Sequence, residues 1–157
     1  MIKPNRRLEI NTYNIRDVFE GLEEHEILYE VYDKEELKNV LDELKVKIVD
    51  NEHYMRVDDT DGSIIISYNH LLYADDVTLH LDIIHELVHI KQLLEGKELY
   101  DDNYSYVDRE TEVEAYRITV KEAKRLGLTK KEILDYLRVE WITEKDLIKL
   151  AKKLGIL

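Results

Sequence analysis

The pattern of apolar and polar residues in the first half of the chain predicts one helix and three strands. Behind Asp33, apolar residues recur at positions 37, 40, 41 and 44, which is the spacing of an amphipathic helix capped by that aspartate. Short apolar runs follow at residues 46–49, 54–57 and 63–68, separated by turn-rich segments. We expect these runs to form a small antiparallel sheet that the helix covers on one face.

The second half of the chain has helical periodicity over most of its length. Residues 77–94 are rich in apolar side chains and contain neither proline nor glycine, which predicts a long buried helix that ends before Gly96. A second long helix is predicted over residues 109–126, with a buried side at positions 113, 116, 120 and 123. Two shorter amphipathic helices are expected behind Thr129 and Thr143.

The pattern of the first 32 residues predicts their secondary structure less clearly. Apolar residues at positions 15, 18, 19 and 22 give a helical face behind Asn14. Residues 27–32 fit either a strand or the end of that helix, and His25 lies among three glutamates, so we expect it on a solvated face.

The first long helix carries the residues with the clearest chemistry. His85 and His89 are one turn apart on the same face, with Glu86 next to the first of them. This H-E-x-x-H order suits a zinc ion bound by two imidazoles, with the glutamate placed to take a proton from water. With six histidines in the chain, composition alone gives about 0.03 chance matches. The alternative is a pair of core histidines, which would leave several buried ring nitrogens to satisfy.

A catalytic zinc site needs a third protein ligand and an open fourth position. In the metzincin pattern a glycine would stand at position 92 and a histidine at position 95, but the chain has Gln92 and Glu95. The other source is a glutamate from the second long helix. Glu112 borders the apolar side of that helix, whereas Glu110 and Glu114 are expected to point more outward, and both stay open as alternatives.

The sequence His85-Glu86-Leu87-Val88-His89, followed by Glu112-Val113-Glu114-Ala115, resembles the H-E-x-x-H and E-x-x-A motifs of gluzincin peptidases. The resemblance covers roughly residues 44 to 127. It is best to the small soluble minigluzincins, and more distant to membrane-embedded gluzincins and to anti-repressor peptidases of mobile elements. It implies that Glu112 is the third ligand and that Ala115 lets the two helices lie close together. Several gluzincins orient a zinc histidine with an aspartate at the position that is Tyr116 here, so that partner must come from elsewhere.

The fold that this resemblance implies is α+β and zincin-like. A small antiparallel three-stranded sheet would pack on an active-site helix and a glutamate-bearing helix, with extra N- and C-terminal helices. Residues 1–157 would form a single zincin-like metallopeptidase domain, with a catalytic core over about 44–127 and a helical tail, 128–157, packed on it. Zincin folds pair extended substrate with a sheet edge, and the expected strand is Ile64–Ile66.

The implied function is zinc-dependent hydrolysis of peptide bonds by a metalloendopeptidase. His85, His89 and Glu112 would hold Zn²⁺, and Glu86 would be the general base on a zinc-activated water. A further side chain often donates a hydrogen bond to the oxyanion. The candidates are Tyr100, Tyr104, Tyr106, Tyr116 and His70.

Composition narrows the class of protein further. A length of 157 residues suits one domain, and the absence of cysteine excludes thiolate ligands. A net charge of −12 argues against nucleic acid as a partner, and no apolar stretch is long enough for a membrane span. We therefore expect a cytoplasmic protein whose partner is a peptide or protein substrate. The alternatives are a latent peptidase covered by one of its ends, or a non-enzymatic zincin-fold binding or regulatory protein, against which the retention of Glu86 argues.

Overall fold

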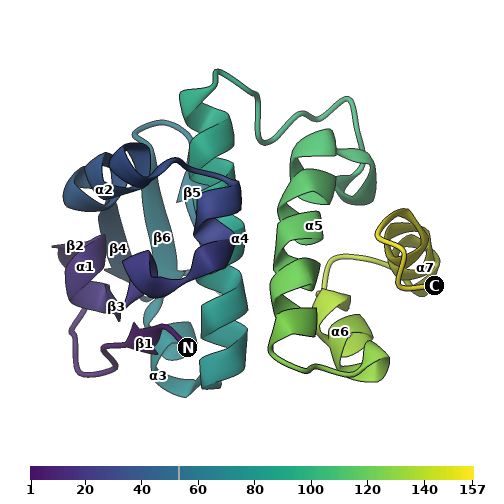
Figure 1. Ribbon diagram of the computed structural model, residues 1–157, viewed down its shortest axis with the longest axis horizontal. Coiled ribbons are helices and arrows are strands. Elements are labelled where there is room, and N and C mark those ends of the chain that lie inside the picture. Colours follow the sequence, from purple (N-terminus) through teal and green to yellow (C-terminus); the bar gives the residue numbers. More distant parts are fainter. Residues whose placement is uncertain (53) are drawn as a thin grey trace.

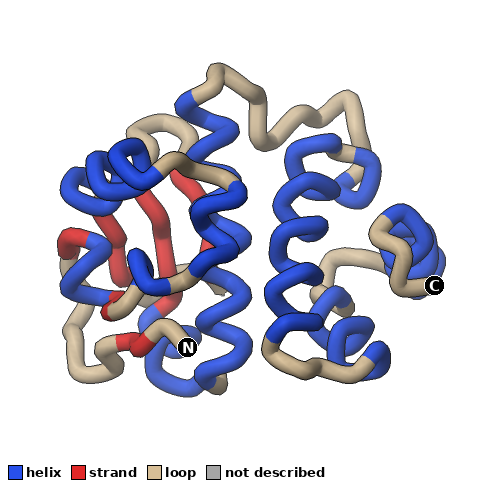
Figure 2. The backbone as a smooth tube through the Cα atoms, viewed as in Figure 1, coloured by secondary structure: helices blue, strands red, loops and turns tan. Residues whose placement is uncertain are grey.

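The computed structural model describes residues 1–52 and 54–157, which form a mixed α and β structure around one long helix. This helix, α4 (Asp76–Leu94), has a sheet on one side and helix α5 (Glu110–Arg125) on the other (Figure 1). The strands all lie on one side of α4, and the chain beyond α4 consists of helices and loops (Figure 2). Among the described residues, no helix combines the length and the apolar character needed to cross a membrane.

The larger sheet has four strands and is mixed. Strands β4 and β6 are parallel neighbours, and the two outer strands pair antiparallel to them. The order is β2 (Thr12–Asn14), β4 (Lys45–Val49), β6 (Ser63–Ser67) and β5 (Met55–Asp58).

The expected antiparallel three-stranded sheet was therefore wrong in strand number and in pairing. The third expected strand, β6, lies between the first two. All five of its residues are buried, as is usual for a central strand, which is covered at both edges and on both faces. The expectation that Ile64–Ile66 pairs with substrate was also wrong, since both edges of β6 are already paired. In the described part of the chain, the outer edge of β5 pairs with no strand.

The N-terminal region is less regular than the sequence predicted. Helix α1 (Ile15–Val18) begins at its Asn14 cap as expected but ends four residues early. Strand β3 (Phe19–Glu20) follows and pairs with β1 (Lys3–Pro4), and Gly21 then takes a φ of 89°, which an L side chain rarely adopts. Two 3-10 turns complete the region, η1 (Leu22–Glu24) and η2 (Glu26–Glu30).

The other predicted helices are confirmed. Asp33 caps α2 (Lys34–Glu43) through the backbone N–H of Glu36, and Thr129 and Thr143 cap the two C-terminal helices in the same way. A short helix behind Ser67 was not predicted. The remaining bounds are α3 (Tyr68–Tyr73), η3 (Tyr106–Asp108), α6 (Lys130–Leu137) and α7 (Glu144–Lys153).

Apolar side chains gather in two clusters that meet at α4. One fills the space between α4, the sheet and the N-terminal helices. The other lies between α4, α5, α6 and α7, and includes the four positions predicted for the buried side of α5. Helix α4 is buried on nearly all sides, which is why its sequence is apolar almost throughout and why its polar residues need specific partners.

Candidate metal centre

The structure brings the four expected site residues together in the interior. His85, Glu86 and His89 project from the middle of α4, and Glu112 projects from the first turn of α5, with all four side chains buried. Ala115, one turn after Glu112, is fully buried where the two helices pack. The two alternatives for the third ligand, Glu110 and Glu114, are exposed and do not belong to the buried group.

Three ligand atoms converge on a single point. Nε2 of His85 lies 3.0 Å from Oε1 of Glu112, Nε2 of His89 lies 2.9 Å from the same oxygen, and the two nitrogens are 3.1 Å apart. A triangle with these sides has a circumradius of about 1.7 Å, so a point about 1 Å off its plane lies about 2 Å from all three atoms, the bond length of zinc to nitrogen and oxygen. The three atoms therefore fit one metal ion.

The hydrogen bonds of Gln92 decide which nitrogen of His89 carries the proton. The side-chain amide of Gln92 donates to the carbonyl of Thr111 (3.0 Å) and to Oε1 of Glu114 (2.8 Å), which turns its oxygen toward Nδ1 of His89 at 2.7 Å. This oxygen only accepts, so Nδ1 must donate. In the neutral ring, Nε2 is then a bare lone pair that faces the metal position.

Thr119 fixes His85 in the same way. Its hydroxyl donates to the carbonyl of Ala115 (2.8 Å), so its oxygen accepts from Nδ1 of His85 at 3.3 Å. With both rings neutral, two nitrogen lone pairs and a carboxylate oxygen face one another without a proton between them. Such an arrangement is repulsive unless a cation occupies its centre, and the orienting partners are those of a metal-binding histidine pair.

The pKa shifts show the same demand for positive charge. Burial lowers the pKa of His85. Burial would also lower the pKa of His89, but hydrogen bonding to Glu112 and the charge of that carboxylate raise it to about 9. Although burial opposes it, hydrogen bonding to the two imidazoles holds the pKa of Glu112 well below its usual range. Without a metal, an imidazolium takes the place of the cation beside Glu112.

Glu86 differs from the ligands because its carboxylate faces open space. It lies in the wall between two adjoining hollows of about 310 and 270 Å³, which together form one cleft. No hydrogen bond or ion pair joins Glu86 to any residue that the structure describes, and burial raises its pKa to about 8. A molecule that enters the cleft can therefore hydrogen-bond to this carboxylate. A buried carboxylate with a raised pKa in such a position is suited to proton transfer.

The candidates for an oxyanion donor are placed differently from one another. Tyr104 is exposed and lies outside the cleft. The hydroxyl of Tyr100 donates to the carbonyl of Val57, and His70 lies in the second hollow with Nε2 on Asp82 (2.7 Å). The remaining pair is Tyr106 and Tyr116, whose hydroxyls are 2.5 Å apart; Tyr106 lines both hollows, and the ring of Tyr116 lies 4.3 Å from that of His85.

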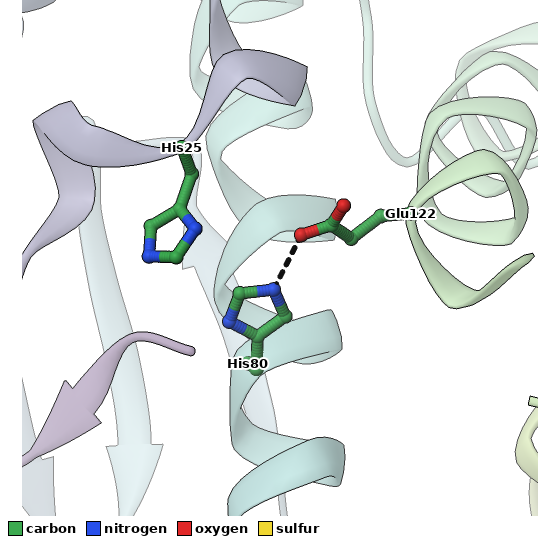
Figure 3. A group of neighbouring side chains, drawn as sticks. All are labelled: His25, His80 and Glu122. Atoms are coloured by element: carbon green, nitrogen blue, oxygen red, sulfur yellow. Dashed lines mark hydrogen bonds and ion pairs between the residues drawn. The ribbon is translucent and has the colours of Figure 1, made fainter. Parts of the chain in front are cut away.

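A second group of two histidines and a glutamate lies on the other side of α4. His80 on α4 meets Glu122 from α5, and His25 reaches them from the segment between η1 and η2 (Figure 3). The expectation that His25 lies on a solvated face was wrong, since its half-buried ring lies edge-on to that of His80 at 5.0 Å.

The hydrogen bonds of this second group leave no ligand atom for a metal on His80. The backbone N–H of Ile2 donates to its Nδ1 (3.0 Å), so the ring proton is on Nε2, which donates to Glu122 (2.5 Å). Arg125 donates to both oxygens of the same carboxylate and supplies the positive charge that a metal would bring. We interpret the group as a hydrogen-bonded link between the N-terminal strand, α4 and α5.

Replacing His80 with alanine is expected to lower the free energy of unfolding by about 2–4 kcal/mol, because the change removes two buried hydrogen bonds, one of them to a carboxylate. Urea denaturation at pH 7.5 measures this, with His25→Ala as the milder control. Burial lowers the pKa of His80, so the fold favours the neutral ring. The stabilisation is present above about pH 6.5, the ordinary pKa of histidine, and is lost as the pH falls through the lowered pKa of the folded protein. A loss of bound metal in His80→Ala at unchanged stability would contradict this interpretation.

Sequence reasoning missed several residues of the site. Gln92 follows His89 by three positions, the spacing of neighbours on one helix face, and this signal was available in the sequence. Thr119, Arg109 and Trp141 come from other elements and carried no local signal. The chain matches no protein-family model, and comparisons with curated proteins and with solved structures gave no significant match.

Proposed function

We propose that this chain is a zinc-dependent metallopeptidase with a gluzincin-type site in a zincin-like fold. The observation that carries the proposal is the convergence of three bare ligand atoms, from His85, His89 and Glu112, beside a carboxylate that faces a cleft. A purely structural metal site has no need for that carboxylate. Two imidazoles and one carboxylate are also the donor set that catalytic zinc sites use, with a fourth position left open.

When bound, zinc supplies a Lewis acid that lowers the pKa of water and polarises a carbonyl group. The chain supplies the remaining parts. Glu86 accepts a proton from the attacking water and passes it to the leaving amine, and its buried position keeps its pKa near neutrality for both transfers. Gln92 and Thr119 hold the imidazoles in the tautomer that presents Nε2.

Tyr106 is the side chain that we assign to the oxyanion. Its hydroxyl shares one hydrogen bond with that of Tyr116, and its side chain lines the cleft on both sides of Glu86. The two hydroxyls together have two protons, and the hydrogen bond between them uses one. The other proton is left to donate to the substrate. Its site on a buried aromatic ring keeps this donor in place before the reaction.

Strand β5 offers a place for an extended peptide. Its outer edge pairs with no described strand, and Met55 and Arg56 line the cleft beside Glu86. The backbone N–H and C=O groups of such an edge can pair with a peptide of any sequence. We therefore expect the substrate to bind as an added β-strand, and not mainly through one side chain in a deep pocket. We therefore assign to β5 the role that the sequence had suggested for β6.

The helical tail narrows the opening of the cleft. Trp141, between α6 and α7, lies 5.7 Å from the ring of Tyr54 and 5.6 Å from that of Tyr106, and Glu140 hydrogen-bonds to Tyr54. These contacts connect the tail to the opposite wall of the cleft. They favour flexible, extended peptides over folded proteins as substrates, and they give the latent form of the enzyme a structural basis.

The proposal is tested with a library of unstructured peptides and zinc-loaded protein. Cleavage products are expected by mass spectrometry, to disappear after zinc is removed with a chelator and to return when zinc is added back. The thermal midpoint should fall on chelation as well, because a ligand that binds only the folded state stabilises it. Cleavage that persists at full rate in the metal-free protein would exclude a metallopeptidase.

A further inference from the structure

We propose that Arg109 forms a carboxylate-binding subsite in the cleft and selects substrates with an acidic group near the scissile bond. This inference rests on the proposed peptidase function and names its substrate class. The carboxylate can come from an aspartate or glutamate side chain or from a free C-terminus, since both offer the same two oxygens to a guanidinium group.

The position of Arg109 places a positive charge in the wall of the cleft. The residue directly precedes α5, three positions before Glu112, and its side chain lines the same hollow as His89, Glu86 and Glu112. Only 17% of the side chain is exposed. The guanidinium group therefore lies largely inside the cleft and not in open solvent.

Arg109 has few partners for a cation in this position. Its Nε donates to the carbonyl of Asp101 at 3.2 Å, and in the described part of the chain its one carboxylate neighbour is the fully exposed Asp102, at 4.0 Å. A guanidinium group has five N–H donors, so most of them are left for water or for a ligand. A poorly paired cation in a partly desolvated site has the most to gain from a carboxylate that enters it.

The other arginine of this hollow shows the contrast. Arg56 on β5 is about half exposed and already bonds Glu52 at 3.1 Å, so we assign it a secondary role. The chain as a whole carries a net charge of −12, and its long-range field repels acidic peptides. Attraction of an acidic substrate therefore has to come from a local cation beside the catalytic groups, and Arg109 is placed to provide it.

The test measures binding, so that it does not depend on hydrolysis. Zinc-loaded Glu86→Gln protein is titrated with end-blocked hexapeptides in which one glutamate is moved along the sequence, each beside its glutamine counterpart. A second arm compares free and amidated C-termini. Calorimetry gives the affinities, and the fluorescence of Trp141, the chain's single tryptophan and a residue of the cleft wall, reports whether the peptide occupies the cleft.

One glutamate position, or the free C-terminus, is expected to bind about tenfold to a hundredfold more tightly than its neutral counterpart. Arg109→Gln should abolish this preference, and Arg109→Lys should keep part of it because the charge remains without the fork. The matched control is Arg117→Gln, an exposed arginine on α5, the helix that Arg109 directly precedes, and this change should have no effect on binding. Peptides that bind without a charge preference, a preference that survives in Arg109→Gln, or no binding at all would overturn the inference.

Hydrolysis by the wild-type protein is measured separately on the same peptides. Selective binding through Arg109 without any cleavage would leave the carboxylate subsite in place and refute the peptidase. Cleavage without acidic preference would keep the peptidase and refute the subsite. The two proposals thus fail by different results.

Discussion

Glu86→Gln is expected to lower kcat/KM for peptide hydrolysis by about 10²–10⁴, the usual contribution of a general base, while the protein still binds one zinc ion. Glutamine has nearly the same shape but cannot accept the proton. The carboxylate makes no hydrogen bond with a described residue, so its replacement breaks no contact of the fold. Since burial raises the pKa of Glu86 to about 8, the fold disfavours its charged form. The amide is never charged and avoids this cost, so stability should be unchanged or slightly higher.

The control for this change is Glu95→Gln, an exposed glutamate just after the same helix. Both variants replace a carboxyl group with a neutral amide, so a general effect of that replacement would appear in both. Steady-state kinetics on one cleaved peptide, together with zinc content by elemental mass spectrometry, separates loss of chemistry from loss of metal. Wild-type turnover in Glu86→Gln would show that another group is the base.

Glu112→Ala is expected to weaken zinc binding about a hundredfold to a thousandfold. A structural zinc site has an apparent binding free energy of about 10–16 kcal/mol, so one of three or four ligands accounts for about 3–4 kcal/mol of it. Both imidazoles contact the same oxygen of Glu112, at 3.0 and 2.9 Å, and the variant would leave them without that charge. Competition with a chromophoric chelator at pH 7.5 measures the affinity.

Glu110→Ala is the matched control, because this residue is on the same turn of α5 but is exposed. It should bind zinc as the wild type does. Glu114→Ala is expected to lie between the two, since Glu114 accepts a hydrogen bond from the Gln92 amide that orients His89. If Glu112→Ala bound zinc as tightly as Glu110→Ala, the assignment of the third ligand would be wrong.

The parts of the site that the sequence predicted are those that depend on local geometry. The spacing of His85 and His89 is set by the helical repeat, and Glu112 could be preferred over its neighbours because it borders an apolar helix face. The caps Asp33, Thr129 and Thr143 were likewise readable, because a cap bonds a backbone group within its own first turn.

The parts that the sequence did not predict depend on contacts between distant segments. The order of the strands depends on which strand is buried most in the folded protein. The local sequence of β6 shows that this strand is apolar, but it does not show which strands pair with it. His25, His80 and Glu122 are far apart in the sequence, and their meeting follows from the packing of α4 between the N-terminal region and α5. The position of Trp141 over the cleft likewise depends on how the tail packs. The apolar side chains of α6 and α7 that hold the tail in place do not indicate by their type which part of the core they contact.

The most direct test of the central claim is an anomalous difference map recorded at the zinc edge from crystals of the zinc-loaded protein. The expected result is one strong peak about 2.0–2.2 Å from Nε2 of His85, Nε2 of His89 and Oε1 of Glu112, and no peak between His25, His80 and Glu122. The absence of a peak at the first group in zinc-loaded crystals, or a peak at the second group alone, would contradict the assignment of the metal centre.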